Sequence, residues 1–420
     1  MDFIEERGMR LRVLAGLLVL GAWALPGAAL PEGKPEQVGL SGVRLQRIQE
    51  TMARHIAEHN ISGAVTLVAR RGQVAHLAAH GLMDAEEKRA MEKNAIFRIW
   101  SMSKPVTGVA ILMLMEEGKV RLNDPVSRFI PEFKGMQVGV AQERAGSAPF
   151  YAVPATREIT IQDLLTHVSG LASGPVSNAE AGKIPNAYGG KLSDSIPKLG
   201  KTPLEFQPGS RWAYSAGAAF DTLGRVVEVA SGARFEDFLR QRLFEPLGMK
   251  ETSFHPTAEQ LRRLVTTYHR DSGKMTRVDA KARMLNLYGS EYAAGAGGLY
   301  STASDYALFA QMLLNGGQGN GQRLLSPKSV ELMASVFVPD TMPGRAAGRA
   351  FGLSVQVISD PVAAGQRVSK GSYGWDGAFG THFWIDPVEK IVGVMMIQTD
   401  NSVRQLDRDF ESAVFQAIVE

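Results

Sequence analysis

Apolar residues recur at helical spacing near both ends of the chain. In the segment 44–60, the residues that share one helical face are Leu45, Ile48, Met52 and Ile56. Residues 403–418 have the same amphipathic spacing. We therefore predict one helix near each end, and each helix has an apolar face that another element must cover.

Short runs rich in β-branched and apolar residues are typical of strands. They occupy residues 64–69, 74–79, 353–358, 383–385 and 391–398. The first two runs are separated by the polar segment 70–73, which predicts a hairpin. The predicted strands therefore come from the two ends of the chain.

The middle of the chain, about residues 101–290, is dominated by helical patterns and loops. The helical patterns cover residues 106–117, 160–167, 218–230 and 235–247. The simplest α+β arrangement is one mixed sheet made from the terminal segments, with a large helical insertion as a second subdomain. A cleft is expected where the two subdomains meet.

Composition excludes several classes of function. The chain of 420 residues has 46 Lys and Arg against 43 Asp and Glu, so it lacks the basic excess of a nucleic-acid-binding protein. Its 45% hydrophobic content is enough for a sizeable core. It has no cysteine, which excludes disulfides, thiolate metal sites and a cysteine nucleophile.

The N-terminal residues 1–29 predict a secretory signal peptide. Arg10 and Arg12 precede the apolar run 13–25, and small residues follow it. The acidic residues before Met9 indicate that translation starts at Met9. Because the apolar run is too short to span a bilayer, we expect export to the periplasm or medium with no membrane span afterwards. If the segment is not used, the protein is cytoplasmic.

Ser101 and Lys104 carry the strongest local chemical signal. They stand three residues apart, directly before the apolar run 106–115. On a helix this spacing puts both on one face, so the amine reaches the hydroxyl, and the N-terminal N–H groups favour negative charge there. Pro105 is compatible with a first helical turn. The pattern indicates an activated nucleophile, and the alternative is a helix cap beside a solvated lysine.

Ser195 and Lys198 repeat the Ser-x-x-Lys pattern. Here Pro197 disfavours a helical conformation at Ile196, so we expect the helical relation between the serine and the lysine to be broken. The pattern is therefore too loose to identify a site by itself.

Histidines suggest two further sites. The run His55-Ile56-Ala57-Glu58-His59 matches the H-x-x-E-H pattern of some zinc peptidases. No third ligand follows in the expected helical setting, so we interpret the run as a solvated helix face and expect no metal site. His167 and His382 could serve a Ser-His-Asp site, but the chain has no Gly-x-Ser-x-Gly elbow. We expect His167 to be structural.

Two motifs later in the chain complete an ordered set with Ser101-x-x-Lys104. The second is Tyr214-Ser215-Ala216, and the third is Trp375-Asp376-Gly377. With these three motifs, residues 36–418 resemble the serine β-lactamase and penicillin-binding-protein superfamily, in particular the class C-like branch that includes the family VIII carboxylesterases. The segments 165–171 and 297–302 also look like structural signatures of that branch.

The resemblance implies a β-lactamase-like fold, with an antiparallel sheet flanked by helices. The α/β part would comprise about residues 36–100 and 290–418, and the helical part about 101–290. Two departures bear on the substrate. Ala216 replaces an asparagine that would bind a lactam side chain, and Trp375 replaces a lysine that helps to hold the lactam carboxylate. Ester cleavage needs neither residue.

The resemblance also implies a set of roles. Ser101 would attack the acyl carbon, and Lys104 with Tyr214 would form the base, since an ammonium beside a phenol favours the phenolate. Which of the two accepts the proton first stays open, because coupled groups titrate together. The backbone N–H groups of Ser101 and Ala378 would bind the oxyanion, with Trp375, Asp376 and Gly377 contacting the substrate.

The expected function is that of a serine carboxylesterase acting on short-chain acyl esters, with weak cephalosporin hydrolysis as a side activity. The alternatives are a β-lactamase or D-amino-acid-specific peptidase of the same superfamily, and a non-catalytic cell-envelope scaffold. No phosphate-binding or dinucleotide motif is present, so no cofactor is expected. The expected partner is a small-molecule ester, and the expected state is a monomer or a small homo-oligomer.

Overall fold

The computed structural model describes residues 29–142, 150–185, 187–286, 289, 291–400 and 405–420. All but one residue of the predicted signal peptide lie outside the described residues, as do the first two residues of the predicted last helix. Among the residues that the structure describes, no helix has the length and apolar character required to cross a bilayer.

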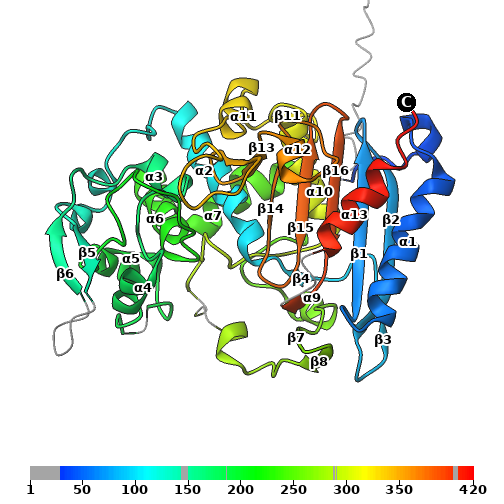
Figure 1. Cartoon of the computed structure of the whole chain (residues 1–420), viewed down its shortest axis with the longest axis horizontal. Helices are drawn as coiled ribbons and strands as arrows, with labels where there is room; N and C mark the ends of the chain where they lie inside the picture. Colours follow the sequence, from blue (N-terminus) through cyan, green and yellow to red (C-terminus); the bar gives the residue numbers. More distant parts are fainter. Residues whose placement is uncertain (1–28, 143–149, 186, 287–288, 290, 401–404) are drawn as a thin grey trace, which may run out of the picture.

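One large sheet occupies one side of the molecule (Figure 1). Its strand order is β12-β13-β14-β15-β16-β1-β2-β3. The strands are β1 Gly63–Arg70, β2 Gln73–Asp84, β3 Arg89–Ala90, β12 Arg349–Phe351, β13 Gln356–Ile358, β14 Tyr373–Asp376, β15 His382–Asp386 and β16 Ile391–Met396. The terminal segments therefore form one sheet, as the pattern predicts.

The prediction of a mixed sheet is wrong, because every pairing within this sheet is antiparallel. For the three consecutive strands β14, β15 and β16, the cause is the length of the connections. Strands β14, β15 and β16 follow one another through short turns, whereas a parallel pair needs a crossover of a dozen or more residues. The antiparallel sheet is the arrangement that the family resemblance implies.

Helices cover both faces of the sheet. Helices α1, Gly42–Ala57, and α13, Leu406–Phe415, pack on one face, and α10, Ala303–Leu314, packs on the other. Strand β1 shows the alternation that this layering requires. Its Val68 belongs to the hydrophobic cluster beneath α1 and α13, while Leu67 belongs to the cluster on the α10 side.

The remaining helices lie mostly between β4 and β9 in the chain. They are α2 Ser103–Glu116, α3 Ile161–Leu165, α4 Pro175–Ala181, α5 Leu192–Leu199, α6 Ala218–Ser231, α7 Phe235–Leu239, α8 Glu245–Leu247 and α9 Ala258–Arg262, followed outside this region by α11 Pro327–Met333 and α12 Pro361–Ala364. The predicted helix over 235–247 is interrupted, because a π-helical turn at Arg240–Phe244 separates α7 from α8.

Several short strands accompany these helices. They are β4 Phe97–Arg98, β5 Gln137–Ala141, β6 Phe150–Pro154, β7 Tyr268–Asp271, β8 Lys274–Arg277, β9 Tyr300–Ser301, β10 Gln318–Gly319, β11 Gln322–Arg323 and β17 Thr399–Asp400. Short 3₁₀ turns lie at Pro35–Val38, Trp100–Met102, Val126–Arg128, Pro131–Phe133 and Arg283–Asn286. The middle of the chain is thus less purely helical than its pattern predicts.

Two local expectations are wrong. Helix α5 continues through Pro197, so the helical relation of Ser195 and Lys198 is kept after all. His55 is not on a solvated face. It is buried beneath α13, where its Nε2 lies 3.0 Å from Asp409 Oδ2. Because α1 ends at Ala57, His59 lies beyond the helix, and the one-turn spacing of a zinc-peptidase helix does not form.

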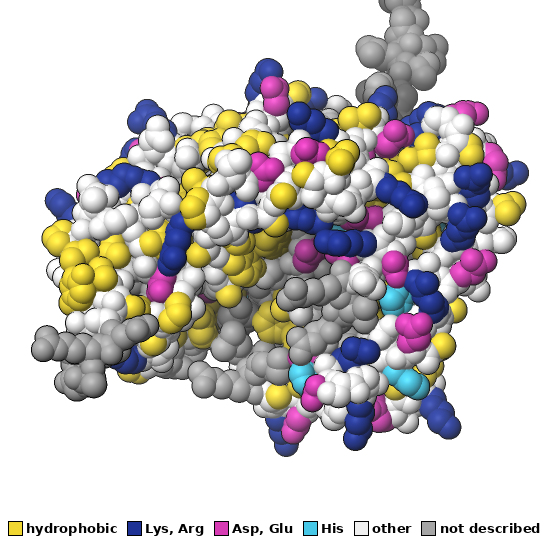
Figure 2. All heavy atoms as spheres, viewed as in Figure 1, with side chains coloured by type: hydrophobic (Ala, Val, Ile, Leu, Met, Phe, Trp, Pro, Cys, Tyr) yellow, Lys and Arg dark blue, Asp and Glu magenta, His cyan; other side chains and the backbone are white. Residues whose placement is uncertain are grey.

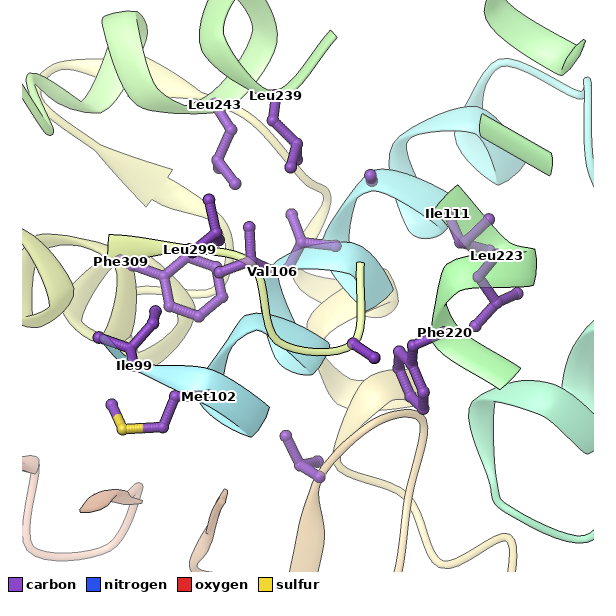
Figure 3. Close-up of a cluster of buried hydrophobic side chains, with 14 of the residues drawn as sticks. Ile99, Met102, Val106, Ile111, Phe220, Leu223, Leu239, Leu243, Leu299 and Phe309 are labelled. Atoms are coloured by element: carbon purple, nitrogen blue, oxygen red, sulfur yellow. The ribbon is translucent and has the colours of Figure 1, made fainter. Parts of the chain in front are cut away.

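Helix α2 runs through the core. Every residue from Ser103 to Leu114 is buried, including the polar residues Ser103, Lys104 and Thr107. Figure 3 shows Val106 of α2 among Leu299, Phe309 and Leu239, which come from three other segments. A helix that is apolar all round is fixed by packing on every side, so the residues at its N-terminus are held firmly in place.

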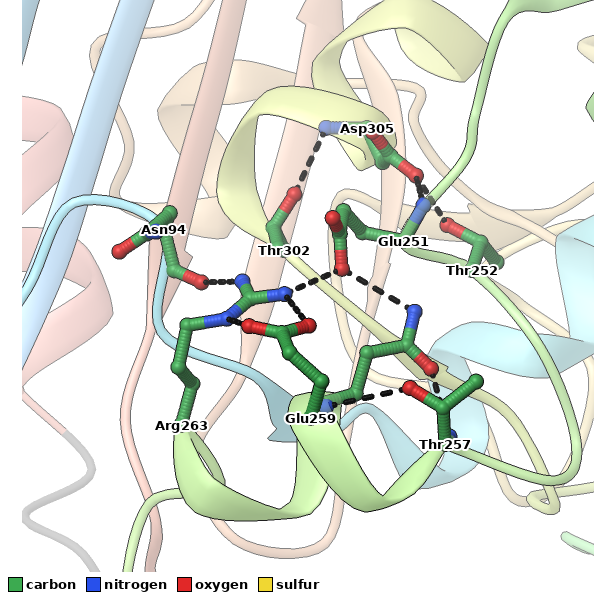
Figure 4. A network of polar contacts seen from close by, with 9 residues as sticks. Asn94, Glu251, Thr252, Thr257, Glu259, Arg263, Thr302 and Asp305 are labelled. Atoms are coloured by element: carbon green, nitrogen blue, oxygen red, sulfur yellow. Dashed lines mark hydrogen bonds and ion pairs between the residues drawn. The ribbon is translucent and has the colours of Figure 1, made fainter.

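A polar network supports the strand that leads into α2. Arg263 donates to the backbone oxygen of Asn94 at 2.6 Å and to Glu251 Oε2 at 2.7 Å (Figure 4). Glu251 is tied in turn, through its backbone N–H, to Asp305 in the first turn of α10. Strand β4, which follows Asn94, pairs with β9 just before α10. The network therefore connects the segment before β4, which leads to Ser101, with the first turn of α10.

Candidate active site

Ser101 lies at a bend between β4 and α2. It sits in the 3₁₀ turn Trp100–Met102, directly before the first residue of the helix. The preceding Trp100 has a φ of 46°, a left-handed conformation that costs free energy for a residue with a Cβ atom. The side chain of Ser101 is partly exposed, although its neighbours Met102 and Ser103 are buried. The bend therefore presents the hydroxyl to solvent from an otherwise buried segment.

The three predicted catalytic side chains converge. Ser101 Oγ lies 3.2 Å from Lys104 Nζ and 2.7 Å from the hydroxyl of Tyr214. Tyr214 stands 113 residues after Ser101 in the chain, in the loop before α6. The arrangement puts an amine and a phenol within hydrogen-bonding distance of the same serine oxygen, which is the geometry of an activated nucleophile.

Lys104 is fully buried, and it has three acceptors for its three N–H donors. Besides Ser101 Oγ, it donates to the backbone oxygens of Ala216 at 2.8 Å and Ala296 at 2.9 Å. Its Nζ also lies 4.9 Å from the centre of the Tyr214 ring, a cation–π distance. The amine is therefore held in one position, aimed at the serine.

Asp221 of α6 is a buried carboxylate close to this amine, and the sequence analysis missed it. Its Oδ1 accepts from the backbone N–H of Ala296, the residue whose carbonyl accepts from Lys104, and its Oδ2 accepts from the hydroxyl of Tyr292. Burial raises the pKa of Asp221 to about 6, although both hydrogen bonds and the charge of Lys104 oppose this. The signal available in the sequence was an acidic residue among the mostly apolar positions 218–227.

His167 packs against the ring of Tyr214 but makes no contact with Ser101 Oγ in the part of the chain that the structure describes. Its ring centre lies 4.7 Å from that of Tyr214, and its Nδ1 accepts from the backbone N–H of Ser215 at 3.2 Å. Burial lowers the pKa of His167 well below 6.5, with Lys104 and Arg345 adding to the effect. The imidazole is therefore neutral at working pH and holds the Tyr214 loop.

The third motif ends strand β14 beside this group. The ring of Trp375 lies 5.6 Å from that of Tyr214. At Gly377 an added Cβ atom would stand 2.5 Å from the backbone oxygen of Ile99, so only glycine fits there. This close approach brings the next residue, Ala378, to the segment that carries Ser101. Asp376 instead contacts His382 of β15, at 2.5 Å.

A cavity of about 470 Å³ adjoins the site. It is lined by Ala216, whose carbonyl binds Lys104, and by Asp221, together with side chains from α4 and α5 and with Tyr188. Its volume falls within the range of small-molecule sites. In Figure 2 the surface is hollowed near the middle of the molecule, and hydrophobic side chains border the hollow.

The family model described as Beta-lactamase matches residues 46–417. The chain belongs to the β-lactamase family. The expected family and the β-lactamase-like fold are therefore confirmed, and so is the expected class of enzyme, a serine hydrolase.

Three relatives of this β-lactamase family protein cover most of it. Protein Rv1367c of Mycobacterium tuberculosis is 36% identical over 80% of this chain and 86% of its own. Esterase EstB of Burkholderia gladioli is 29% identical over 85% of this chain and 90% of its own. The structure of EstCE1, described as a hydrolase with promiscuous acyltransferase activity, has a TM-score of 0.74 and 26% identity, covering 89% of this chain and 99% of that one.

Proposed function

We propose that the protein is a serine carboxylesterase that hydrolyses short-chain acyl esters through an acyl-enzyme on Ser101. The observation that carries the proposal is the convergence of Lys104 Nζ and the Tyr214 hydroxyl on Ser101 Oγ. The esterase EstB, a relative over most of the chain, supports the choice of substrate class.

The proposed reaction has two halves. The Lys104–Tyr214 pair takes the proton of the Ser101 hydroxyl while the serine oxygen bonds to the acyl carbon. The tetrahedral intermediate then expels the alcohol, which leaves with that proton. In the second half, water gives a proton to the same pair and attacks the acyl-enzyme, and the carboxylic acid leaves as the Ser101 hydroxyl is restored.

The proposed oxyanion site consists of the backbone N–H groups of Ser101 and Ala378. Supporting it, Gly377 lies against the Ile99 carbonyl, two residues before Ser101. One such donor contributes about 3 kcal/mol to transition-state stabilisation. We propose that Trp375, next to the Tyr214 ring, forms a wall for the substrate.

An ester fits the surroundings better than a β-lactam. Ala216 brings no side-chain amide to the site, and Trp375 brings no cation. Neither position therefore offers the polar partner that a lactam side-chain carbonyl or a lactam carboxylate would need, and a buried polar group left without a partner weakens binding. We propose that the cavity beside Ala216 receives the larger group of the ester.

The test combines labelling with a substrate panel. A fluorophosphonate should label the wild type and the control Ser193→Ala, whose serine lies on α5 outside the site, but not Ser101→Ala. On p-nitrophenyl esters from acetyl to decanoyl, kcat/KM should exceed that on cephalosporins and D-Ala peptides by about 100-fold. A preference for the lactam or the peptide would refute the esterase assignment, and absence of labelling would favour the scaffold.

Export is a separate proposal, which rests on Arg10, Arg12 and the apolar run 13–25. Expression with residues 1–29 intact should give a periplasmic or secreted protein that has lost this segment. Intact-mass measurement would show the loss, and an uncleaved protein in the cytoplasm would contradict the proposal.

A further inference from the structure

His382 is the first residue of β15, and its imidazole is buried between two carboxylates, next to the end of β14 that carries the third motif. Its Nδ1 lies 2.5 Å from Asp376 Oδ1 on β14, and its Nε2 lies 3.3 Å from Glu411 Oε1 on α13. Glu411 is itself fixed, since its Oε2 accepts from Gln366 at 2.9 Å. One imidazole thus connects the edge of the proposed active site to a helix on the other face of the sheet.

The surrounding charges keep this imidazole protonated. Burial by itself would lower the pKa of His382, but Asp376 and Glu411 outweigh it and raise the pKa well above 6.5. Asp407, also on α13, adds a third carboxyl group to the same small cavity, and Arg349 is the one cation besides His382 that lines it among the described residues. On β15 the ring of Trp384 stacks against the imidazole.

Asp376 and His382 are cross-strand partners that bracket a short turn. Within the turn, Gly377 N–H donates to the Thr381 carbonyl at 2.7 Å, and Thr381 Oγ1 donates to the Ile99 carbonyl at 3.2 Å. The turn contains Ala378, the second proposed oxyanion donor. The position of the Ala378 N–H therefore depends on how the two ends of the turn are held.

We propose that His382, clamped between Asp376 and Glu411, is a positioning residue that fixes the Ala378 N–H for the oxyanion. The inference rests on the proposed esterase function, and it assigns Asp376 to the support of the turn. The imidazole contacts no substrate. It acts by preventing the turn from shifting, since a shift of about 1 Å at a reacting centre costs up to about 100-fold in rate.

The clamp has a pH dependence with a definite sign. Protonated His382 is held by a hydrogen bond to Asp376 at 2.5 Å and by an ion pair with Glu411 at 3.3 Å. The clamp is therefore complete below the ordinary histidine pKa of 6.5 and is lost as the pH rises through the raised pKa of His382. The esterase rate should therefore rise with pH as the catalytic base is deprotonated, and then fall at alkaline pH as the clamp opens.

The decisive variant is Glu411→Gln, which keeps the shape of the side chain and removes one of the charges that hold the proton. In a plot of kcat against pH, the fall at alkaline pH should move to lower pH by about one unit, while KM and the rise at acidic pH stay unchanged. Glu389→Gln is the matched control. It removes the carboxylate that pairs with Arg70 at the opposite end of β15, so both limbs should stay in place.

A second variant, His382→Gln, should abolish the alkaline limb and lower kcat about tenfold at every pH, part of the 10²–10³-fold that loss of one oxyanion donor costs. A melting temperature that falls in Glu411→Gln while both limbs remain in place would overturn the inference and leave a structural role only. The wild type separates this outcome from failure of the proposed function, because without an esterase on Ser101 the wild type would show neither labelling nor ester turnover.

Discussion

The chain contains two Ser-x-x-Lys sequences, and both are helical or lie at a helix start. In the first, Lys104 is fully buried and reaches Ser101 Oγ at 3.2 Å. In the second, on α5, Ser195 is buried but Lys198 is exposed. The same local spacing thus brings amine and hydroxyl together in one copy only.

The difference lies in what surrounds each lysine. The amine of Lys104 is aimed by the carbonyls of Ala216 and Ala296, which stand more than a hundred residues further along the chain. An exposed lysine such as Lys198 has water as its partner, and its side chain keeps its rotamer freedom. A Ser-x-x-Lys sequence therefore becomes a candidate site only where the tertiary structure removes the lysine from water and supplies other acceptors.

The sharpest test of the comparison is a pair of matched substitutions. Lys104→Met should lower kcat by about 10³-fold or more, because the base is lost from beside the nucleophile. Lys198→Met removes the same group from the other copy and should leave kcat within about twofold. Steady-state kinetics on a p-nitrophenyl ester would measure both. A similar loss in both variants would show that the two copies do not differ in function.

Tyr214→Phe tests the third member of the group around Ser101. The variant should lower kcat by about 10²-fold and leave KM nearly unchanged, since the hydroxyl acts on the serine proton and not on bound substrate. The measurement is kcat and KM from saturation curves. A rise in KM at constant kcat would make Tyr214 a binding residue instead.

Asp221→Asn tests the buried charge beside Lys104. The acidic limb of the kcat profile should move to lower pH by about one unit, because removing a nearby negative charge favours loss of the proton from the ammonium. The rate at the plateau should fall severalfold, since the resulting base is weaker. Kinetics across pH 5–9 would measure both effects, and an unmoved limb would show that Asp221 only supports the fold.

Pro197→Ala has the smallest expected effect on activity. Pro197 lies inside α5, where proline lacks a helical N–H and crowds the preceding turn. Alanine should therefore raise the free energy of unfolding by about 1–2 kcal/mol, after allowance for its more flexible unfolded chain. Chemical denaturation would measure the gain, and kcat should not change. Lower stability would mean that Pro197 fits this helix better than its ring geometry indicates.

Much of the layout is predictable from the sequence because its signals are local. The spacing of Leu45 and Ile48 marks α1, and the run 391–398 marks β16, since periodicity reports directly which face of an element is buried. The direction of strand pairing is not visible in the hydrophobic pattern. Short turns make β14, β15 and β16 antiparallel, whereas β16 and β1 pair antiparallel from opposite ends of the chain.

The surroundings of single residues were harder to predict. Nothing in the spacing around His55 distinguishes a solvated position from one beneath α13, because the covering helix comes from the other end of the chain. Pro197 was expected to break a helix, but the helix persists because its neighbours Ile196 and Leu199 are buried. In each case packing outweighed a local preference.

The sequence by itself determined the chemical inventory: a serine and a lysine three residues apart, a tyrosine, and a glycine after Trp375, in an order that resembles a known superfamily. Only the tertiary structure brought Tyr214 within 2.7 Å of Ser101 and buried Lys104 and Asp221 near each other. The physical reason is that residue spacing controls neighbours within a turn, whereas desolvation and contacts between distant segments depend on the packing of the whole chain.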